Sequence, residues 1–200
     1  MKITAIKQQV KRAGRYSIYV DDKFAFGLSE AALVEQGLAS GQVLTEARLR
    51  ELQKAADLDK AYNNALRYVA MRPRSEWELR EYFRRKGVDE DAGAQIAERL
   101  RRLGMLSDLS FARSWVTSRR LLKATSKRRL QLELKQKHVP DDVIGQVLAE
   151  DETDERTTLR ELIAKKRARY PDDQKLMHYL ARQGFNFDDI KAELAAGEEY

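Results

Sequence analysis

The apolar positions of the chain repeat one helical pattern three times. The copies cover residues 75–88 (SEWELREYFRRKGV), 126–139 (SKRRLQLELKQKHV) and 172–185 (DDQKLMHYLARQGF). Each copy has two apolar residues four positions apart, on one helical face, and ends with a small or polar residue followed by an apolar one. The aligned positions are Leu79, Leu130 and Leu176; Phe83, Leu134 and Leu180; Gly87, His138 and Gly184; and Val88, Val139 and Phe185. Such a repeat indicates stacked helical units with an elongated binding surface, because one unit alone cannot bury its apolar face.

Helix start and stop signals extend each copy to a unit of three helices. The three prolines, at positions 73, 140 and 171, fall at junctions and never interrupt the helical period. Ser75 and Glu78 form a capping box at the start of the first copy. Around the first copy the expected helices span 59–71 and 91–103; the later units span 108–122, 126–137 and 141–150, then 154–169, 172–183 and 188–195.

The first 28 residues favour strands instead. Runs rich in β-formers at 16–20 and 24–26 predict a hairpin, and residues 4–10 can pair with the first run to give a three-stranded meander. Asp22 stands where glycine would suit a tight turn, so we expect a looser turn over 21–23.

Two short helices are expected after the meander. Ser29 caps one that ends at Gly37, and Thr45 caps another that runs toward Lys54. The predicted fold class is therefore mainly α, with a small β-meander and short helices before three tandem three-helix repeats. The expected boundaries are 1–57 for the N-terminal part, 58–105 for repeat 1, 106–151 for repeat 2 and 152–200 for repeat 3.

Positive charge is concentrated in the middle of the chain. The net charge is +6, but the 25 residues from Arg113 to Lys137 carry nine cations and a single acid, Glu133. Such density suits a polyanion or an acidic protein surface, and a solvated helix face is an equal alternative. This basic band comprises Arg113, Arg119, Arg120, Lys123, Lys127, Arg128, Arg129, Lys135 and Lys137.

Catalytic chemistry finds no support in the sequence. The chain has no cysteine, and its two histidines, His138 and His178, lie 40 residues apart without clustered carboxylates. Phosphate-binding loops, nucleophile elbows and dinucleotide fingerprints are absent. We therefore expect a protein that is not an enzyme, with no catalytic, metal or cofactor site. No apolar run suits a membrane span or a signal peptide, so a cytoplasmic location is expected.

The aromatic residues of the repeats are interpreted as packing groups. Phe83 occupies a repeated apolar position, and Trp115 shares a helical face with Phe111, so both are expected in the core. Trp77 flanks the apolar face and is expected to be partly exposed packing rather than a stacking platform for bases.

Four segments together resemble the bacterial RecX family of regulatory proteins. They are 16–28 (YSIYVDDKFAFGL), 61–87 (AYNNALRYVAMRPRSEWELREYFRRKG), 103–120 (LGMLSDLSFARSWVTSRR) and 127–139 (KRRLQLELKQKHV). The most specific motifs are the RPRSE run at 72–76, followed by Leu79, and FARSW at 111–115. The resemblance covers nearly the whole chain and is weakest after Glu150. The chain departs from the pattern at Asp22, where a turn glycine is common, and at His138, where the repeat suggests glycine.

The resemblance implies a non-enzymatic regulator of the RecA recombinase. RecX-like proteins build three three-helix repeats into a curved, elongated body that binds in the groove of the RecA–DNA filament. Such binding restrains strand exchange, ATP hydrolysis and the co-protease function of the DNA-damage (SOS) response. The expected partner is RecA or its filament on single-stranded DNA, with weak direct contact to DNA and none to membranes, and the chain is expected to be a monomer.

Two other functions stay open at this stage. A direct DNA-binding protein is the main alternative, because three-helix units with a basic second helix look like helix-turn-helix readers. Against it, the basic helices carry Arg and Lys, which suit phosphates, more than the Asn and Gln that read bases. The β-rich start and the small number of units argue against an armadillo or HEAT adaptor. The candidate partner-binding residues are Arg72, Arg74, Arg84, Arg85, Lys86, Arg119, Arg120, Lys123, Lys127, Arg128, Arg129, Lys135 and Lys137.

Overall fold

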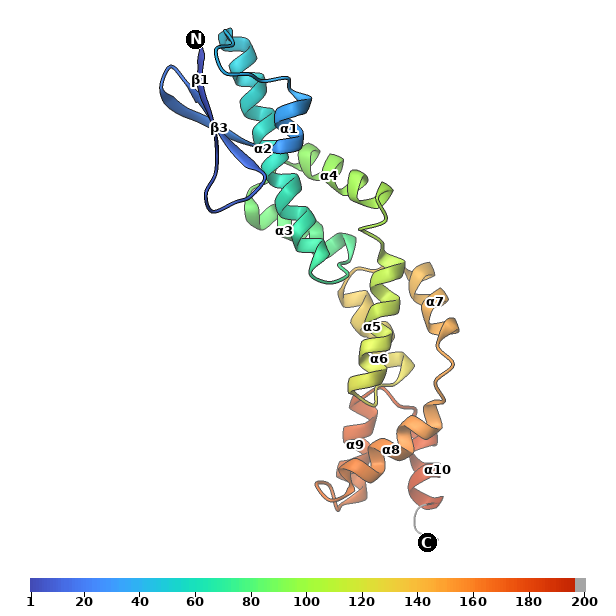
Figure 1. Ribbon diagram of the computed structural model, residues 1–200. Helices are drawn as coiled ribbons and strands as arrows, with labels where there is room; N and C mark the ends of the chain where they lie inside the picture. The colour runs from blue at the N-terminus through green and yellow to red at the C-terminus, as the bar shows by residue number, and fades with distance from the viewer. Residues whose placement is uncertain (197–200) are drawn as a thin grey trace. The chain divides into compact units, whose positions relative to one another are not determined.

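A computed structural model describes residues 1–196 and divides the chain into two compact units (Figure 1). The first, called the N-terminal unit, contains Met1–Arg72 and Tyr82–Arg102. The second, called the repeat unit, contains Pro73–Glu81 and the chain from Leu103 onward. The helix α3 (Glu76–Lys86) contributes residues to both units.

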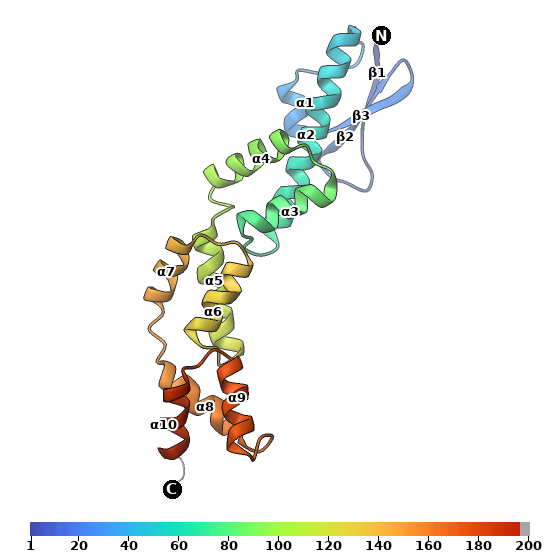
Figure 2. The same ribbon diagram turned by 180° about the vertical axis from the view of Figure 1, so that it is seen from behind.

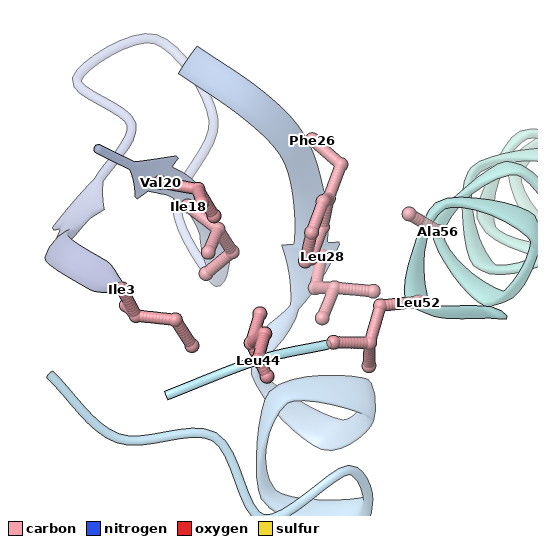
Figure 3. Packing of buried hydrophobic residues seen from close by; sticks show 8 residues of the cluster. All are labelled: Ile3, Ile18, Val20, Phe26, Leu28, Leu44, Leu52 and Ala56. Carbon is pink, nitrogen blue, oxygen red and sulfur yellow. The ribbon is translucent and has the colours of Figure 1, made fainter. Parts of the chain in front are cut away.

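A three-stranded antiparallel sheet opens the N-terminal unit, as the alternating pattern predicts. Its strands are β1 (Ile3–Gln8), β2 (Arg15–Val20) and β3 (Lys23–Ser29), paired in the order β1-β2-β3. Ile18, Val20, Phe26 and Leu28 from β2 and β3 pack with Leu52 and Ala56 of the helix α2 (Glu46–Ala70), as Figure 3 shows. These side chains form one apolar core between sheet and helix.

The turn between β2 and β3 is tight, so the expected loose turn is wrong. Val20 pairs with Lys23, which leaves only Asp21 and Asp22 in the turn, with φ of 47° and 63°. Aspartate tolerates this left-handed region better than most residues. The turn is also held by residues at and just before the start of β1, because the Lys2 amide donates to Asp21 Oδ1 at 2.8 Å and the Asp22 amide donates to the hydroxyl of Thr4 at 3.0 Å.

Ser29 caps α1 (Glu30–Glu35) and Thr45 caps α2 (Glu46–Ala70), as expected. The predicted break in α2 between residues 54 and 59 is wrong, since one helix of 25 residues runs through it and across the expected boundary at 57–58. No glycine or proline interrupts this stretch, and one face stays buried along its length. In its middle, Asp59 forms a largely buried ion pair with Arg15, with Nη1 and Oδ2 3.2 Å apart.

The remaining helices follow the predicted three-helix pattern to within two residues at most ends (Figure 1). They are α4 (Glu90–Arg102), α5 (Asp108–Leu122), α6 (Lys127–Gln136), α7 (Asp141–Glu150), α8 (Glu155–Arg167), α9 (Asp173–Arg182) and α10 (Phe187–Ala196). Helices α5, α6 and α7 pack together, as do α8, α9 and α10, and both groups are also visible from behind (Figure 2). Each group has its own apolar core.

The repeated apolar positions are buried, which confirms the repeat register. The leucines at the first position are fully buried, and Leu134 and Leu180 at the second are equally so. Phe83 is 5% exposed, whereas Leu132, two residues past Leu130, is 47% exposed. The repeat therefore marks the inward face of α3, α6 and α9.

A recurrent hydrogen bond joins successive middle helices within the repeat unit. The hydroxyl of Ser75, before α3, donates to the carbonyl of Lys137 at the end of α6 at 3.2 Å. In the same way the hydroxyl of Ser126, before α6, donates to the carbonyl of Gln183 at the end of α9 at 2.8 Å. Both serines are fully buried. We call these contacts the serine junctions.

His138 directly follows the C-terminal cap of α6, and the surroundings of this position explain why histidine stands there instead of glycine. His138 and Gly184 occupy aligned positions, and both have positive φ, 54° and 91°. A Cβ at Gly184 would lie 2.5 Å from the Ser126 hydroxyl, so this position requires glycine. At the other junction the His138 ring stacks on Trp77, with the ring centroids 4.7 Å apart. The histidine therefore provides a contact that glycine could not make.

Candidate functional site

The carboxylate of Glu133 on α6 organises the centre of the basic band. Its Oε2 accepts hydrogen bonds from Arg119 Nε at 2.7 Å and from the indole nitrogen of Trp115 at 3.0 Å, both on α5. Arg129 lies 3.5 Å from its other oxygen. The lone acid of the band therefore holds two of its arginines and fixes α5 against α6.

Trp115 lies at the edge of the core rather than fully inside it. Its ring packs near Phe111, with centroids 5.7 Å apart, and remains half-buried. The guanidinium of Arg119 lies 4.6 Å from the ring centroid, and Lys137 Nζ lies 5.4 Å from it. Cations at these distances are attracted by the negative face of an indole. Trp115 thus connects the apolar core to the charged surface.

A second buried carboxylate, Glu78 of α3, is held by two of the candidate residues. Lys137 Nζ lies 3.1 Å from Glu78 Oε1, and Arg74 lies 4.0 Å from Oε2. Only 7% of the Glu78 side chain is exposed. A carboxylate this buried needs partners, because desolvation makes an unpaired charge costly. Lys137 and Arg74 therefore have structural roles beside the serine junction.

Arg120 and Arg113 are anchored to the end of α7. Arg120 donates to Asp151 Oδ2 from Nε at 3.0 Å, and it also donates to the carbonyl of Thr125. Burial alone raises the pKa of Asp151, but hydrogen bonds from Arg120 and Thr153 outweigh it and hold the pKa below its ordinary value. Arg113 forms a two-bond pair with Glu150, and hydrogen bonds from Arg113 and Gln146 lower the pKa of Glu150 to about 2. Both arginines tie α5 to the start of the connection to α8.

Three cations of the band form no ion pair with any residue among 1–196. They are Lys123 in the connection from α5 to α6, and Lys127 and Arg128 in the first turn of α6. Lys135 pairs with Asp141 at 3.0 Å, but both side chains are largely exposed, so this pair contributes little to stability. Lys123 and Arg128 are thus exposed cations without an ion pair in the described part of the chain, whereas Lys127 is only partly exposed.

The other predicted cations, Arg72, Arg84, Arg85 and Lys86, belong to the N-terminal unit. All four are exposed, and the last three form the final turn of α3. Positive charge is favourable there, because the C-terminal end of a helix carries partial negative charge. The structure thus divides the predicted set between its two units.

Sequence reasoning locates the cations but misses the acids that neutralise part of them. Glu133 is visible in the sequence as a carboxylate four residues after Arg129 on one helix. Glu150 and Asp151 pair with cations 37 and 31 residues distant, and Glu78 pairs with Lys137, 59 residues distant, in addition to its neighbour Arg74; no local pattern indicates these distant partners. Among the described residues no helix is long and apolar enough to cross a membrane.

The fold and the charged surface define a class of protein: tandem three-helix units that carry exposed cations on their surface. Family comparison makes this class specific. Residues 1–45 match the regulatory protein RecX N-terminal domain, residues 61–100 the first three-helix domain of RecX, and residues 107–148 the second. The chain belongs to the RecX family of regulatory proteins.

Relatives and solved structures agree with this assignment. Regulatory protein RecX of Leuconostoc citreum is 35% identical over 193 residues, which cover 93% of this chain and 72% of the relative. Regulatory protein RecX of Listeria monocytogenes is 32% identical over 207 residues, which cover 99% of this chain and 76% of the relative. The crystal structure of a regulatory protein RecX aligns with a TM-score of 0.75 and 26% identity, covering 95% of this chain and 97% of that one. The crystal structure of RecX from Lactobacillus salivarius aligns with a TM-score of 0.64 and 25% identity, covering 73% of this chain and 99% of that one.

Proposed function

We propose that the chain binds the RecA filament on single-stranded DNA and inhibits the filament's activities without catalysing a reaction itself. Membership of the RecX family supports regulation of RecA. The activities that would be restrained are strand exchange, ATP hydrolysis and the co-protease step of the SOS response, in the cytoplasm.

The observation that carries the proposal is the set of cations left unpaired on the repeat unit. Lys127 and Arg128 stand in the first turn of α6, where the partial positive charge of the helix N-terminus opposes them. No carboxylate among the described residues forms an ion pair with the side chain of Lys123, Lys127 or Arg128. An acidic partner, either protein or nucleic acid, would supply that compensation.

Binding of variants to RecA assembled on single-stranded DNA tests this function. Lys123→Glu with Arg128→Glu reverses two exposed, unpaired cations and is expected to weaken filament binding at least tenfold, with helical content unchanged. Lys165→Glu with Lys175→Glu is the matched control, because these exposed lysines of repeat 3 change the net charge equally. Equal loss in both variants, or no loss in either, would contradict the assigned surface.

Reversal of the neighbouring pair, Arg128 and Arg129, is a less clean test. Replacing both by glutamate is expected to weaken filament binding and to keep the fold. Arg129 faces Glu133, however, so Arg129→Glu places two carboxylates four residues apart on α6 beside the Trp115 contact. Part of any decrease in binding would then reflect a disturbed α5–α6 contact.

Direct DNA binding remains the alternative, and the same variants distinguish it. If Lys123→Glu with Arg128→Glu reduces binding to duplex DNA without RecA as strongly as binding to the filament, the surface is a DNA site. If only filament binding falls, RecA supplies the essential contact.

A further inference from the structure

A groove on the N-terminal unit has a charge pattern that the sequence did not single out. Two adjoining hollows, of about 470 and 1070 Å³, both contain Arg12, Asp57 and Lys60. The smaller lies between α2 and β3, and the larger between α2 and the turn from α3 to α4. Because they share these residues, we treat them as one groove along α2, called the α2 groove.

Four exposed cations from separate parts of the N-terminal unit line the α2 groove. Arg12 comes from the connection between β1 and β2, Lys54 and Lys60 come from α2, and Lys86 comes from the end of α3. None of the four forms an ion pair with any residue that the structure describes. Only Lys86 is among the cations predicted from the sequence.

The acids of the groove do not neutralise these cations. Asp89 is engaged locally, because its Oδ1 accepts hydrogen bonds from the amides of Asp91 and Ala92 at the start of α4, at 3.1 and 3.2 Å. Asp57 is exposed and has no ion pair within the described chain. The groove thus keeps a surplus of positive charge, which favours an anionic ligand with several charges in a row.

An exposed aromatic ring at the same groove indicates which polyanion fits. Phe24 of β3 lines the smaller hollow together with Arg12 and Lys60 and is 61% exposed. It makes an edge-to-face contact with Tyr19, with the ring centroids 6.1 Å apart and the planes at 78°. A bare phenyl ring beside cations suits an unpaired base stacked above it, whereas a duplex keeps its base faces covered. An acidic protein segment would form ion pairs with the cations, but its carboxylates would make no stacking contact with this ring.

We propose that the α2 groove binds a single strand of nucleic acid. The backbone phosphates contact Arg12, Lys54, Lys60 and Lys86, and one base stacks on Phe24. The contact carries no sequence preference, because phosphate and ring contacts are available to every base. The proposal goes beyond regulation of RecA and does not rest on it, since the binding needs no second protein.

Binding of fluorescent oligo-dT to the whole chain, measured by anisotropy over a range of salt concentrations, tests the cations. Lys54→Gln with Lys60→Gln is expected to weaken binding about tenfold and to lower the slope of log affinity against log salt by about 0.7 for each phosphate that is no longer bound. Lys2→Gln with Lys23→Gln removes the same charge from exposed positions of this unit outside the groove and is expected to change little. Equal affinities for the two variants would overturn the proposal.

Phe24→Ala separates stacking from charge. It is expected to weaken oligo-dT binding roughly tenfold and to leave the salt slope unchanged, because stacking releases no counterions. Val34→Ala, which shortens another exposed apolar side chain of the same unit, is the control. If Phe24→Ala binds oligo-dT as tightly as the unaltered chain does, no base stacks on Phe24, and that part of the proposal is wrong.

Competition identifies the ligand class. Unlabelled oligo-dT is expected to displace the probe better than a duplex of equal length, and oligo-rU is expected to compete because the phosphates and base faces are shared. Equal competition by the duplex would contradict a single-strand site. If poly-glutamate binding depends on Lys54 and Lys60 while oligo-dT binding does not, the groove's ligand is an acidic protein and the proposal fails.

Discussion

At the scale of single residues, the repeat separates inward from outward leucines on the same helix. Leu130→Ala removes a fully buried side chain from the core of α5, α6 and α7 and is expected to cost roughly 2–5 kcal/mol of unfolding free energy. Leu132→Ala truncates a side chain that is 47% exposed and is expected to cost less than about 1 kcal/mol. Urea unfolding of both variants measures the difference. Equal destabilisation would show that the repeat register is wrong, and with it the outward placement of the basic band.

Residue chemistry also explains why the turn in the sheet was not predictable from its own residues. Tight turns favour glycine, so the presence of aspartate at both Asp21 and Asp22 predicts a loose connection. The positive φ of both residues is supported by hydrogen bonds with Lys2 and Thr4, at the start of β1 and almost twenty positions earlier. Such support depends on strand pairing, which local turn rules do not include.

At the scale of elements, the repeated helix ends provide two aligned glycines for a test. Gly184→Ala puts a methyl group 2.5 Å from the Ser126 hydroxyl in a backbone with φ of 91°, so it is expected to cost more than about 2 kcal/mol. Gly87 has φ of 65° and, apart from its own chain neighbours, no heavy atom within 4 Å of the place that a Cβ would take, so Gly87→Ala is expected to cost only about 1 kcal/mol. Thermal unfolding compares the two. A smaller destabilisation at Gly184 would rule out close packing at the junction.

The elements also show where sequence patterns are sufficient. Caps, prolines and the repeated leucines locate α5 and α7 to the residue and the other repeat helices closely, because these signals are local. The continuity of α2 does not follow from them, since weak amphipathicity between residues 54 and 59 looks like a break although no breaker is present. Tertiary contacts hold that stretch, among them the pair of Arg15 with Asp59.

The candidate site was predictable only in part for a similar reason. The density of cations is a property of composition and is read directly from the chain. Which cations are available to a partner depends on acids that folding brings to them, such as Asp151 for Arg120. The α2 groove was not predictable, because its cations come from three segments that no linear pattern connects.

At the scale of the whole molecule, the anchored acids predict acid sensitivity. The pKa of Asp151 and of Glu150 is lowered in the folded chain, so each carboxylate stabilises it above the unfolded pKa of about 4, and the contribution is lost as pH falls through the folded pKa. The unfolding free energy is therefore expected to fall between about pH 4.5 and 2. Asp151→Asn is expected to cost roughly 1–3 kcal/mol at pH 6 and to flatten this dependence. Urea unfolding at pH 6 and pH 3 measures both, and an unchanged pH slope in Asp151→Asn would contradict the assignment.

We propose that this RecX-family chain regulates RecA by occupying its filament. The most direct measurement is the rate of ATP hydrolysis by RecA on single-stranded DNA while the chain is titrated in. The account predicts slowing at less than one copy per RecA subunit, a weaker effect for Lys123→Glu with Arg128→Glu than for Lys165→Glu with Lys175→Glu, and no hydrolysis by the chain alone. An unchanged RecA rate at equimolar chain, or ATP hydrolysis that stays with the purified chain, would contradict it.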